Sequence, residues 1–270
     1  MPLTKPYKGI SLNYEIHGNG PPLLLISGTG HNLEFWSNQL PYFTEKYSSI
    51  VFDNRGVGRS TVPVADYALA DMADDTASLL DHLNINSAHV MGFSMGGHIA
   101  QELAINHPDR VTSLGIHHSW SKNTPRLKKF QETRLHLAKN DQRIALTELS
   151  MLALHSSSYY DSNPKEMEAH RSFLLNKSPL NNGWIGQLEA CIKGNTFDRL
   201  NLIKSPTLIT CSNLDIIAPP HLSQVIQENV KNSELHIMEG TGHVSLMESP
   251  KEFAYICLNF LTSVKNDINN

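Results

Sequence analysis

One serine in the chain has the surroundings of a nucleophile. Ser94 is the centre of a Gly-x-Ser-x-Gly motif at residues 92–96. A serine hydroxyl becomes reactive when a base takes its proton and an acid orients that base. His243, in a glycine-rich loop, and Asp215, a few residues after an apolar run, are the candidates for these two roles. Together they predict nucleophilic catalysis, in which Ser94 attacks, His243 moves the proton and Asp215 holds the imidazole.

The residues around Ser94 favour this interpretation. An apolar run at residues 88–91 precedes the motif, and residues 97–106 after it have helical spacing. A nucleophile at such a strand-to-helix turn adopts a strained backbone conformation, and glycines on either side avoid steric clashes. The alternative is an ordinary turn rich in small residues. The chain order Ser94, Asp215, His243 favours the catalytic interpretation, because the acid and the base follow later strands in that order.

The attacked carbonyl oxygen also needs two backbone N–H donors as it becomes negatively charged. Met95, next to the nucleophile, is one candidate donor. The other is Thr29, because the glycines on either side of it let the backbone approach a ligand closely. This Gly-Thr-Gly segment is not a dinucleotide-binding fingerprint, since Leu33 occupies the position of the third glycine.

Seven apolar runs predict the strands that would position these residues. They lie at residues 10–17, 23–26, 50–52, 88–91, 111–116, 206–211 and 235–238. Segments with helical spacing separate most of them. This alternation predicts an α/β fold, in which helices flank a mostly parallel central sheet. Loops at the carboxyl edge of such a sheet would bring Asp215 and His243 to Ser94.

Residues 120–193 interrupt the alternation, because they contain no strand-like run and their apolar residues have helical spacing. Thr124-Pro125 and Asn163-Pro164 are typical helix starts. We therefore expect a core formed by residues 1–119 and 194–270, with a helical cap at 120–193 inserted between two strands. The apolar stripes expected to face inward are Leu127, Phe130 and Leu135, and then Ile144, Leu146, Leu149 and Leu152.

Four residues are candidates for the wall of a substrate pocket. His31 follows the Gly-Thr-Gly segment, Phe93 precedes the nucleophile, and His118 and Trp120 follow a predicted strand end that faces the cap. Polar loop positions explain the two histidines equally well, and isolated aromatic residues are more often part of a core. The chain has no His-Glu-x-x-His or Cys-x-x-Cys spacing, so we expect neither a metal nor a cofactor.

Composition excludes several other classes of protein. The 270 residues carry a formal net charge of −4, which argues against a nucleic-acid binder. No apolar run approaches the eighteen or so residues of a membrane span, and the first residues lack the apolar segment of a signal peptide. The three cysteines are far apart and form no disulfide framework. These features predict a cytoplasmic protein, and they do not indicate an oligomeric state.

The motifs together resemble the α/β-hydrolase-fold superfamily, in particular its group of serine esterases, lactonases and cofactor-free haloperoxidases. The resemblance covers nearly the whole chain and is carried by residues 27–30, 53–60, 92–97, 206–208, Asp215 and 242–243. The nucleophile Ser94 distinguishes the chain from dehalogenase and epoxide-hydrolase relatives, which use aspartate. One departure is Ser27, where many relatives carry histidine.

The resemblance implies a serine hydrolase that cleaves a small or medium carboxylic ester or lactone through an acyl-enzyme intermediate. Its partner would then be a small-molecule substrate. Two alternatives stay open, because function depends on the site and not on the fold. One is a carbon–carbon bond hydrolase, lyase or perhydrolase that uses the same triad. The other is a ligand-binding receptor or signalling protein with a nearly silent triad.

Overall fold

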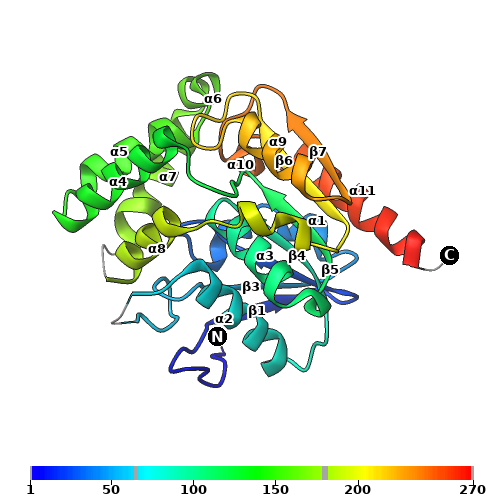
Figure 1. Cartoon of the computed structure of the whole chain (residues 1–270). Coiled ribbons are helices and arrows are strands. Elements are labelled where there is room, and N and C mark those ends of the chain that lie inside the picture. Colours follow the sequence, from blue (N-terminus) through cyan, green and yellow to red (C-terminus); the bar gives the residue numbers. More distant parts are fainter. Residues whose placement is uncertain (1, 64–65, 178–181, 269–270) are drawn as a thin grey trace.

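Seven strands form one sheet, and every expected apolar run contributes to it (Figure 1). The computed structural model describes residues 2–63, 66–177 and 182–268. The strands lie in the order β1-β3-β2-β4-β5-β6-β7, and all neighbouring pairs except β1 and β3 are parallel. The α/β fold with a mostly parallel sheet is therefore confirmed. The strands are β1 (Tyr14–His17), β2 (Pro22–Ile26), β3 (Ser48–Phe52), β4 (Ala88–Phe93), β5 (Val111–His117), β6 (Thr207–Ser212) and β7 (Ser233–Met238).

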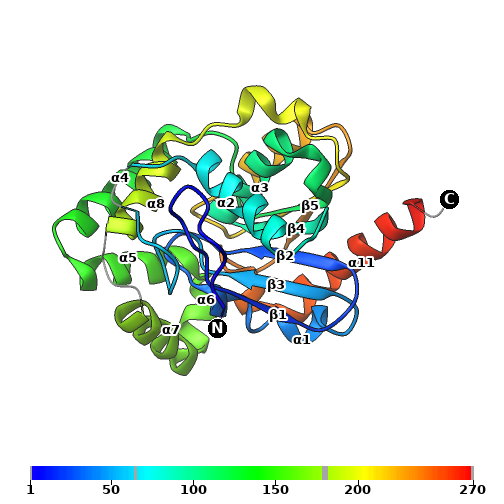
Figure 2. The same ribbon diagram turned by 90° about the horizontal axis from the view of Figure 1, so that it is seen from below.

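Helices cover both faces of this sheet. In Figure 2, α2 and α3 lie on one face, and α1 and α11 lie on the other. The helix α9 packs against β6 and β7. None of the helices in the described ranges is both long and apolar enough to cross a membrane. The helices of this part of the chain are α1 (Leu40–Phe43), α2 (Leu69–His82), α3 (Met95–Asn106), α9 (Pro220–Asn229), α10 (Ser245–Glu248) and α11 (Pro250–Ile268), with 3₁₀ turns η1 (Leu33–Trp36), η2 (Pro108–Arg110) and η3 (Phe197–Leu202).

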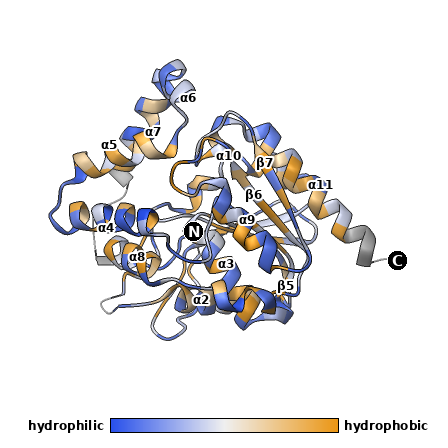
Figure 3. Cartoon of the chain, turned by 45° about the horizontal axis from the view of Figure 1, so that its top comes forward, coloured by the Kyte–Doolittle hydropathy of each residue, from blue (hydrophilic) through white to orange (hydrophobic). Residues whose placement is uncertain are grey.

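The central strands are continuous apolar runs because both of their faces are covered. Leu23, Leu24, Leu25 and Ile26 of β2 are all fully buried. Such runs are typical of parallel strands between two layers of helices. In Figure 3, β6, which carries Leu208, Ile209 and Cys211, is coloured mainly as hydrophobic, whereas α4 alternates between hydrophobic and hydrophilic residues. The sheet is thus a rigid platform for the loops at its carboxyl edge.

Five consecutive helices lie between β5 and β6, and they gather at one end of the sheet (Figure 1). We call α4–α8 the cap helices. The expected helix starts are present: Thr124 caps α4 by accepting a hydrogen bond from the backbone N–H of Leu127, and α7 begins at Pro164. Lys122 and Asn195 form an isolated antiparallel bridge where the chain leaves and re-enters this region. The cap helices are α4 (Pro125–Lys139), α5 (Arg143–Leu154), α6 (Ser157–Ser162), α7 (Pro164–Lys177) and α8 (Asn182–Lys193).

Two expectations about local structure need correction. The first strand begins at Tyr14, because Ile10 pairs only with Tyr7 in an isolated bridge. In α5, the expected apolar stripe does not all face inward: Ile144 and Leu152 are 65% and 64% exposed. The buried face of α5 instead follows Leu146, Thr147, Ser150, Met151 and Leu154, a 3.6-residue repeat that includes two small polar residues.

Candidate active site

Ser94 lies at a sharp turn between β4 and α3. Its φ of 56° and ψ of −115° place a non-glycine residue in a region that L-amino acids rarely adopt. The two motif glycines make this turn possible. A Cβ atom at Gly92 would lie 2.1 Å from the carbonyl oxygen of Gly96, and one at Gly96 would lie 2.2 Å from the carbonyl oxygen of Ile26. The packing therefore requires glycine at both positions and holds Ser94 above the sheet edge.

The structure brings the three expected catalytic residues into one hydrogen-bonded line. The loop after β7 carries His243, whose Nε2 lies 3.0 Å from Oγ of Ser94. The loop after β6 carries Asp215, whose Oδ2 lies 2.7 Å from Nδ1 of His243. The backbone N–H groups of Ile217 and Ala218 donate to the other carboxylate oxygen at 2.8 and 2.9 Å. This arrangement fixes the orientation of the imidazole and leaves its Nε2 free to accept a proton from the serine.

A second histidine contacts the same carboxylate. Nδ1 of His118 lies 3.1 Å from Oδ2 of Asp215, and its Nε2 lies 2.7 Å from Oγ of Ser245. Burial alone would raise the pKa of Asp215, but the charge of a protonated His243 and the hydrogen bonds from both histidines hold this pKa well below its usual range. Burial lowers the pKa of His118, so its ring is neutral and donates through Nδ1.

His118 and Trp120 therefore occupy other places than the pocket wall expected for them. Both side chains are fully buried, and neither is among the residues that line the pocket. The backbone of His118 has a φ of 51°, which turns the chain at the end of β5 and directs the ring toward Asp215. Trp120 packs edge-on against the ring of His98 on α3. A position after a strand end therefore does not reveal whether the side chain lines the pocket or is buried in the protein interior.

His118, Asp215 and His243 are also the group of side chains in the described ranges that could hold a metal ion. Ligand atoms of His118, Asp215 and His243 all lie within 4.8 Å of one another. Both histidines are already hydrogen-bonded to Asp215, and His243 also contacts Ser94. A metal at this place would compete with the bond that orients His243. The arrangement fits a hydrogen-bonded catalytic group.

The expected oxyanion donors lie beside the nucleophile. A Cβ atom at Gly28 would lie 3.3 Å from Cβ of Ser94, so this loop packs directly on the serine turn. Within the described part of the chain, the backbone N–H groups of Thr29 and Met95 donate no hydrogen bond to protein atoms. Met95 is the first residue of α3, where backbone N–H groups have no partner inside the helix. Two uncommitted donors next to Ser94 are what an oxyanion requires.

The cap helix α8 holds this loop in place. Oε1 of Gln187 accepts a hydrogen bond from the backbone N–H of Gly30 at 2.8 Å, and its Nε2 donates to the carbonyl oxygen of Arg55 at 2.9 Å. The indole ring of Trp184 covers Gly30, where a Cβ atom would lie 1.6 Å from Nε1. Sequence reasoning did not identify Gln187, because an amide within a helix carries no signal of such a distant contact.

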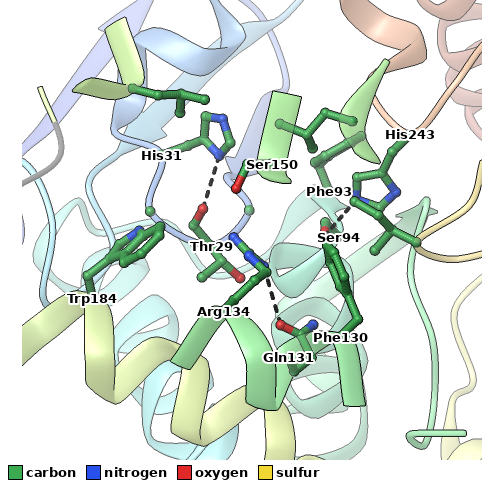
Figure 4. A pocket seen from close by; sticks show the side chains of 15 residues that line it. Thr29, His31, Phe93, Ser94, Phe130, Gln131, Arg134, Ser150, Trp184 and His243 are labelled. Atoms are coloured by element: carbon green, nitrogen blue, oxygen red, sulfur yellow. Dashed lines mark hydrogen bonds between the residues drawn. The ribbon is translucent and has the colours of Figure 1, made fainter. Parts of the chain in front are cut away.

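One pocket contains both Ser94 and His243 (Figure 4). About 560 Å³ of space lies between its lining atoms, and this figure includes the open mouth. His31 and Phe93 line it, as expected. The cap helices contribute nearly half of the lining residues, namely Phe130, Gln131, Arg134, Ser150, Leu154, Leu174 and Trp184. The remaining lining residues of the core are Gly28, Thr29, Gly30 and Ile217.

The pocket residue that sequence reasoning missed most clearly is Arg134. It lies on α4 at the helical spacing of Leu127 and Gln131, both of which are buried. An arginine on the inward face of an amphipathic helix is the sequence signal that could have indicated it. Its charge also affects the pocket: burial first, and then the charge of Arg134, lower the pKa of His31 to about 4.

Comparisons with known proteins agree with this fold. The family model of the α/β hydrolase fold matches residues 21–250, and the chain belongs to this family. A protein of Caulobacter sp. strain K31, provisionally named carbamate hydrolase RutD, is 30% identical over 257 residues, which cover 93% of this chain and 96% of that relative. These relationships make the protein a hydrolase of the α/β-hydrolase fold.

Solved structures give the same assignment of the fold. A thermophilic esterase from Thermogutta terrifontis superposes with a TM-score of 0.87 at 25% identity, covering 97% of each chain. The enol-lactonase from Burkholderia xenovorans LB400 superposes with a TM-score of 0.89, covering 97% of this chain and all of that one. Its identity of 23% restricts this second likeness to the fold.

Proposed function

We propose that the protein is a serine hydrolase that cleaves a small carboxylic ester or lactone through Ser94, His243 and Asp215. The observation that carries the proposal is the pair of short contacts, 3.0 Å from Ser94 to His243 and 2.7 Å from His243 to Asp215. A general base must lie within about 3.2 Å of the oxygen whose proton it abstracts, and Nε2 of His243 satisfies this condition.

In the proposed reaction, Oγ of Ser94 attacks the substrate carbonyl while Nε2 of His243 takes the hydroxyl proton. The N–H groups of Thr29 and Met95 bind the oxyanion. His243 then gives its proton to the leaving alcohol, which produces the acyl-enzyme. Water attacks this intermediate with His243 again as the base, and the acid product departs. Asp215 stabilises the imidazolium in both halves of the cycle and stays ionised throughout.

The cap helices take part in this proposal as the roof of the pocket. Residues 120–193, taken as a cap on the core of residues 1–119 and 194–270, supply Phe130, Gln131, Arg134 and other parts of the wall. Substrate choice would then depend on the cap, whereas the bond-breaking step would depend on core residues. Carbamates share the acyl carbonyl of esters, and the name of the Caulobacter relatives gives a reason to test them beside esters.

The test combines turnover with covalent labelling. Wild-type protein and Ser94→Ala are assayed on short 4-nitrophenyl esters, lactones and carbamates, and both are treated with a fluorophosphonate and measured by intact mass. We expect turnover and one added phosphonyl group at Ser94 in the wild type. In Ser94→Ala we expect no label and a loss of turnover of at least about 10³-fold.

The control is Ser113→Ala, a buried serine in β5 that contacts His89 and lies outside the pocket. It should be labelled like the wild type. Full turnover in Ser94→Ala would overturn the assignment of the nucleophile. Labelling of Ser94 with negligible turnover on every substrate would instead favour the receptor with a nearly silent triad.

A further inference from the structure

Arg134 points from α4 into the pocket that contains Ser94 (Figure 4). The side chain is partly buried, and its Nε is fully buried. Arginine on a helix face that packs inward is costly unless something compensates its charge, because a guanidinium is always protonated near neutral pH. Whether the protein itself compensates this charge depends on the groups that surround the guanidinium.

Within the described ranges, Arg134 has few hydrogen-bond partners and no acidic partner. Its one hydrogen bond runs from Nη1 to Oε1 of Gln131 at 3.3 Å, and Nε has no partner. It forms no ion pair with an acidic residue of those ranges, in contrast to Arg55, which binds Asp75 through Nε and Nη2 at 2.5 and 2.7 Å. The described lining of the pocket contains no aspartate or glutamate.

Two aromatic rings shape the surroundings of this charge. The guanidinium carbon lies 5.7 Å from the ring centroids of both Phe130 and Trp184. Cation–π contacts at this distance compensate part of the charge, but the rings provide no hydrogen-bond acceptor for the N–H groups that Gln131 does not bind. Burial lowers the pKa of Arg134 to about 10, so the side chain is still cationic at neutral pH. The guanidinium of Arg134, with N–H donors still available, thus faces an apolar and partly closed pocket.

We propose that Arg134 binds a carboxylate of the substrate, so that the preferred substrates are small esters or lactones that carry an anionic group. The planar guanidinium presents adjacent N–H donors that match the two oxygens of a carboxylate. A substrate bound in this way would hold its carboxylate under α4 and its reacting carbonyl at Ser94. The inference rests on the proposed function for the ester-cleaving step, and it adds the class of substrate.

A pair of substrates that differ only in charge tests the proposal. The first is 4-nitrophenyl hydrogen glutarate, which carries a free carboxylate, and the second is its neutral methyl ester. After subtraction of the uncatalysed rates, we expect kcat/KM of the wild type to favour the anionic substrate by roughly 10- to 100-fold. Arg134→Met keeps the apolar stem but removes the donors, and it should abolish this preference while the neutral ester is still hydrolysed.

Two further variants separate recognition from packing and from long-range charge. Arg134→Lys keeps the charge and should retain part of the preference. Lys128→Gln removes an exposed positive charge from the same helix and should leave the preference unchanged. If the wild type shows no preference for the anion, or if Arg134→Met lowers both rates equally, then Arg134 has a structural role only and the proposal is wrong.

A binding experiment makes the outcome independent of turnover. Monomethyl glutarate and dimethyl glutarate are titrated into Ser94→Ala and into Ser94→Ala combined with Arg134→Met. Preferential binding of the monoanion that disappears with Arg134 supports the anion site, even if no ester is hydrolysed and the proposed function fails. Equal binding of both compounds to Ser94→Ala overturns the anion site, even if Ser94 is shown to be the nucleophile.

Discussion

His118 and Asp215 lie 3.1 Å apart, and the carboxylate oxygen that joins them is the same one that receives the hydrogen bond of His243. The two imidazole rings therefore lie next to each other, with their centroids 5.6 Å apart. Because the ionised carboxylate of Asp215 can only accept, the neutral ring of His118 carries its proton on Nδ1, and its Nε2 accepts from the hydroxyl of Ser245. His118 is therefore a positioning residue for Asp215 in the proposed triad.

The first prediction concerns this contact. His118→Leu removes one donor to Asp215 and should lower kcat for 4-nitrophenyl acetate roughly 10- to 100-fold, as loss of an orienting partner does in other sites. KM should change little, because His118 is not part of the pocket lining. His118→Gln can still donate and should recover part of kcat. The control is His117→Gln, whose native ring contacts Thr210 instead; an unchanged kcat in His118→Leu contradicts the positioning role.

The second prediction concerns the glycine before the nucleophile. Gly92→Ala would place Cβ 2.1 Å from a backbone oxygen that cannot move without distorting the serine turn. We expect a loss of about 3 kcal/mol or more in the free energy of unfolding, measured in urea. Gly240→Ala is the comparison, since it has a φ of +73° but nothing within 4 Å, and it should cost only about 1 kcal/mol. Since Gly92 has no positive φ, a loss no larger than that of Gly240→Ala would contradict the clash as the cause.

The third prediction is an acid-dependent loss of stability. His98 is fully buried with neither ring nitrogen hydrogen-bonded in the described structure, and burial lowers its pKa to about 3. Between that value and the unfolded pKa of about 6.5, the unfolded chain binds the extra proton, so stability falls as the pH is lowered. From pH 7 to pH 5, His98 should account for a loss of about 2 kcal/mol in the free energy of unfolding.

His98→Leu tests this assignment, because leucine fills the site without titrating. Urea unfolding at pH 7 and pH 5 should show a smaller pH-dependent loss for the variant than for the wild type. His221→Gln, at an exposed position on α9, is the control and should show the loss of the wild type. If His98→Leu loses as much stability as the wild type over this interval, the buried histidine is not responsible.

The fourth prediction links the cap to the oxyanion loop. Gln187→Leu removes the acceptor for the N–H of Gly30 and the donor to Arg55. The loop that carries Thr29 should then shift, with kcat reduced roughly tenfold or more and KM affected less, because donors to a developing charge act mainly in the transition state. Glu189→Gln on the same helix, which breaks only a surface ion pair with Lys139, should retain the kcat of the wild type. Unchanged kcat in Gln187→Leu would contradict this support.

Much of the fold could be predicted from sequence because its signals are local. Short apolar runs indicated six of the strands, an alternating apolar pattern indicated the first one, and the motif around Ser94 indicated the sharp turn. The positions of Asp215 and His243 followed from a general property of parallel sheets, in which loops after the strands meet at one edge. These inferences required only the order of elements along the chain.

The rest depends on tertiary contacts that no local pattern contains. Trp120 and Trp184 are similar as residue types, but only Trp184 reaches the pocket, because the direction of α8 places its ring over Gly30. His118 is turned toward Asp215 by a positive φ that the sequence does not indicate. The exposure of Ile144 depends on how α5 is rotated against its neighbours, and apolar spacing alone left that rotation open.

The bridge between Lys122 and Asn195 joins the two points between which the cap helices are inserted. The entropy of closing a loop rises only slowly with its length, so the pairing of β5 with β6 is almost insensitive to how many residues lie between these points. Ser94, Asp215 and His243 all lie outside this interval. The whole insertion can therefore be lengthened, shortened or exchanged in one recombination event that leaves the residues of the proposed triad unchanged and alters the choice of substrate.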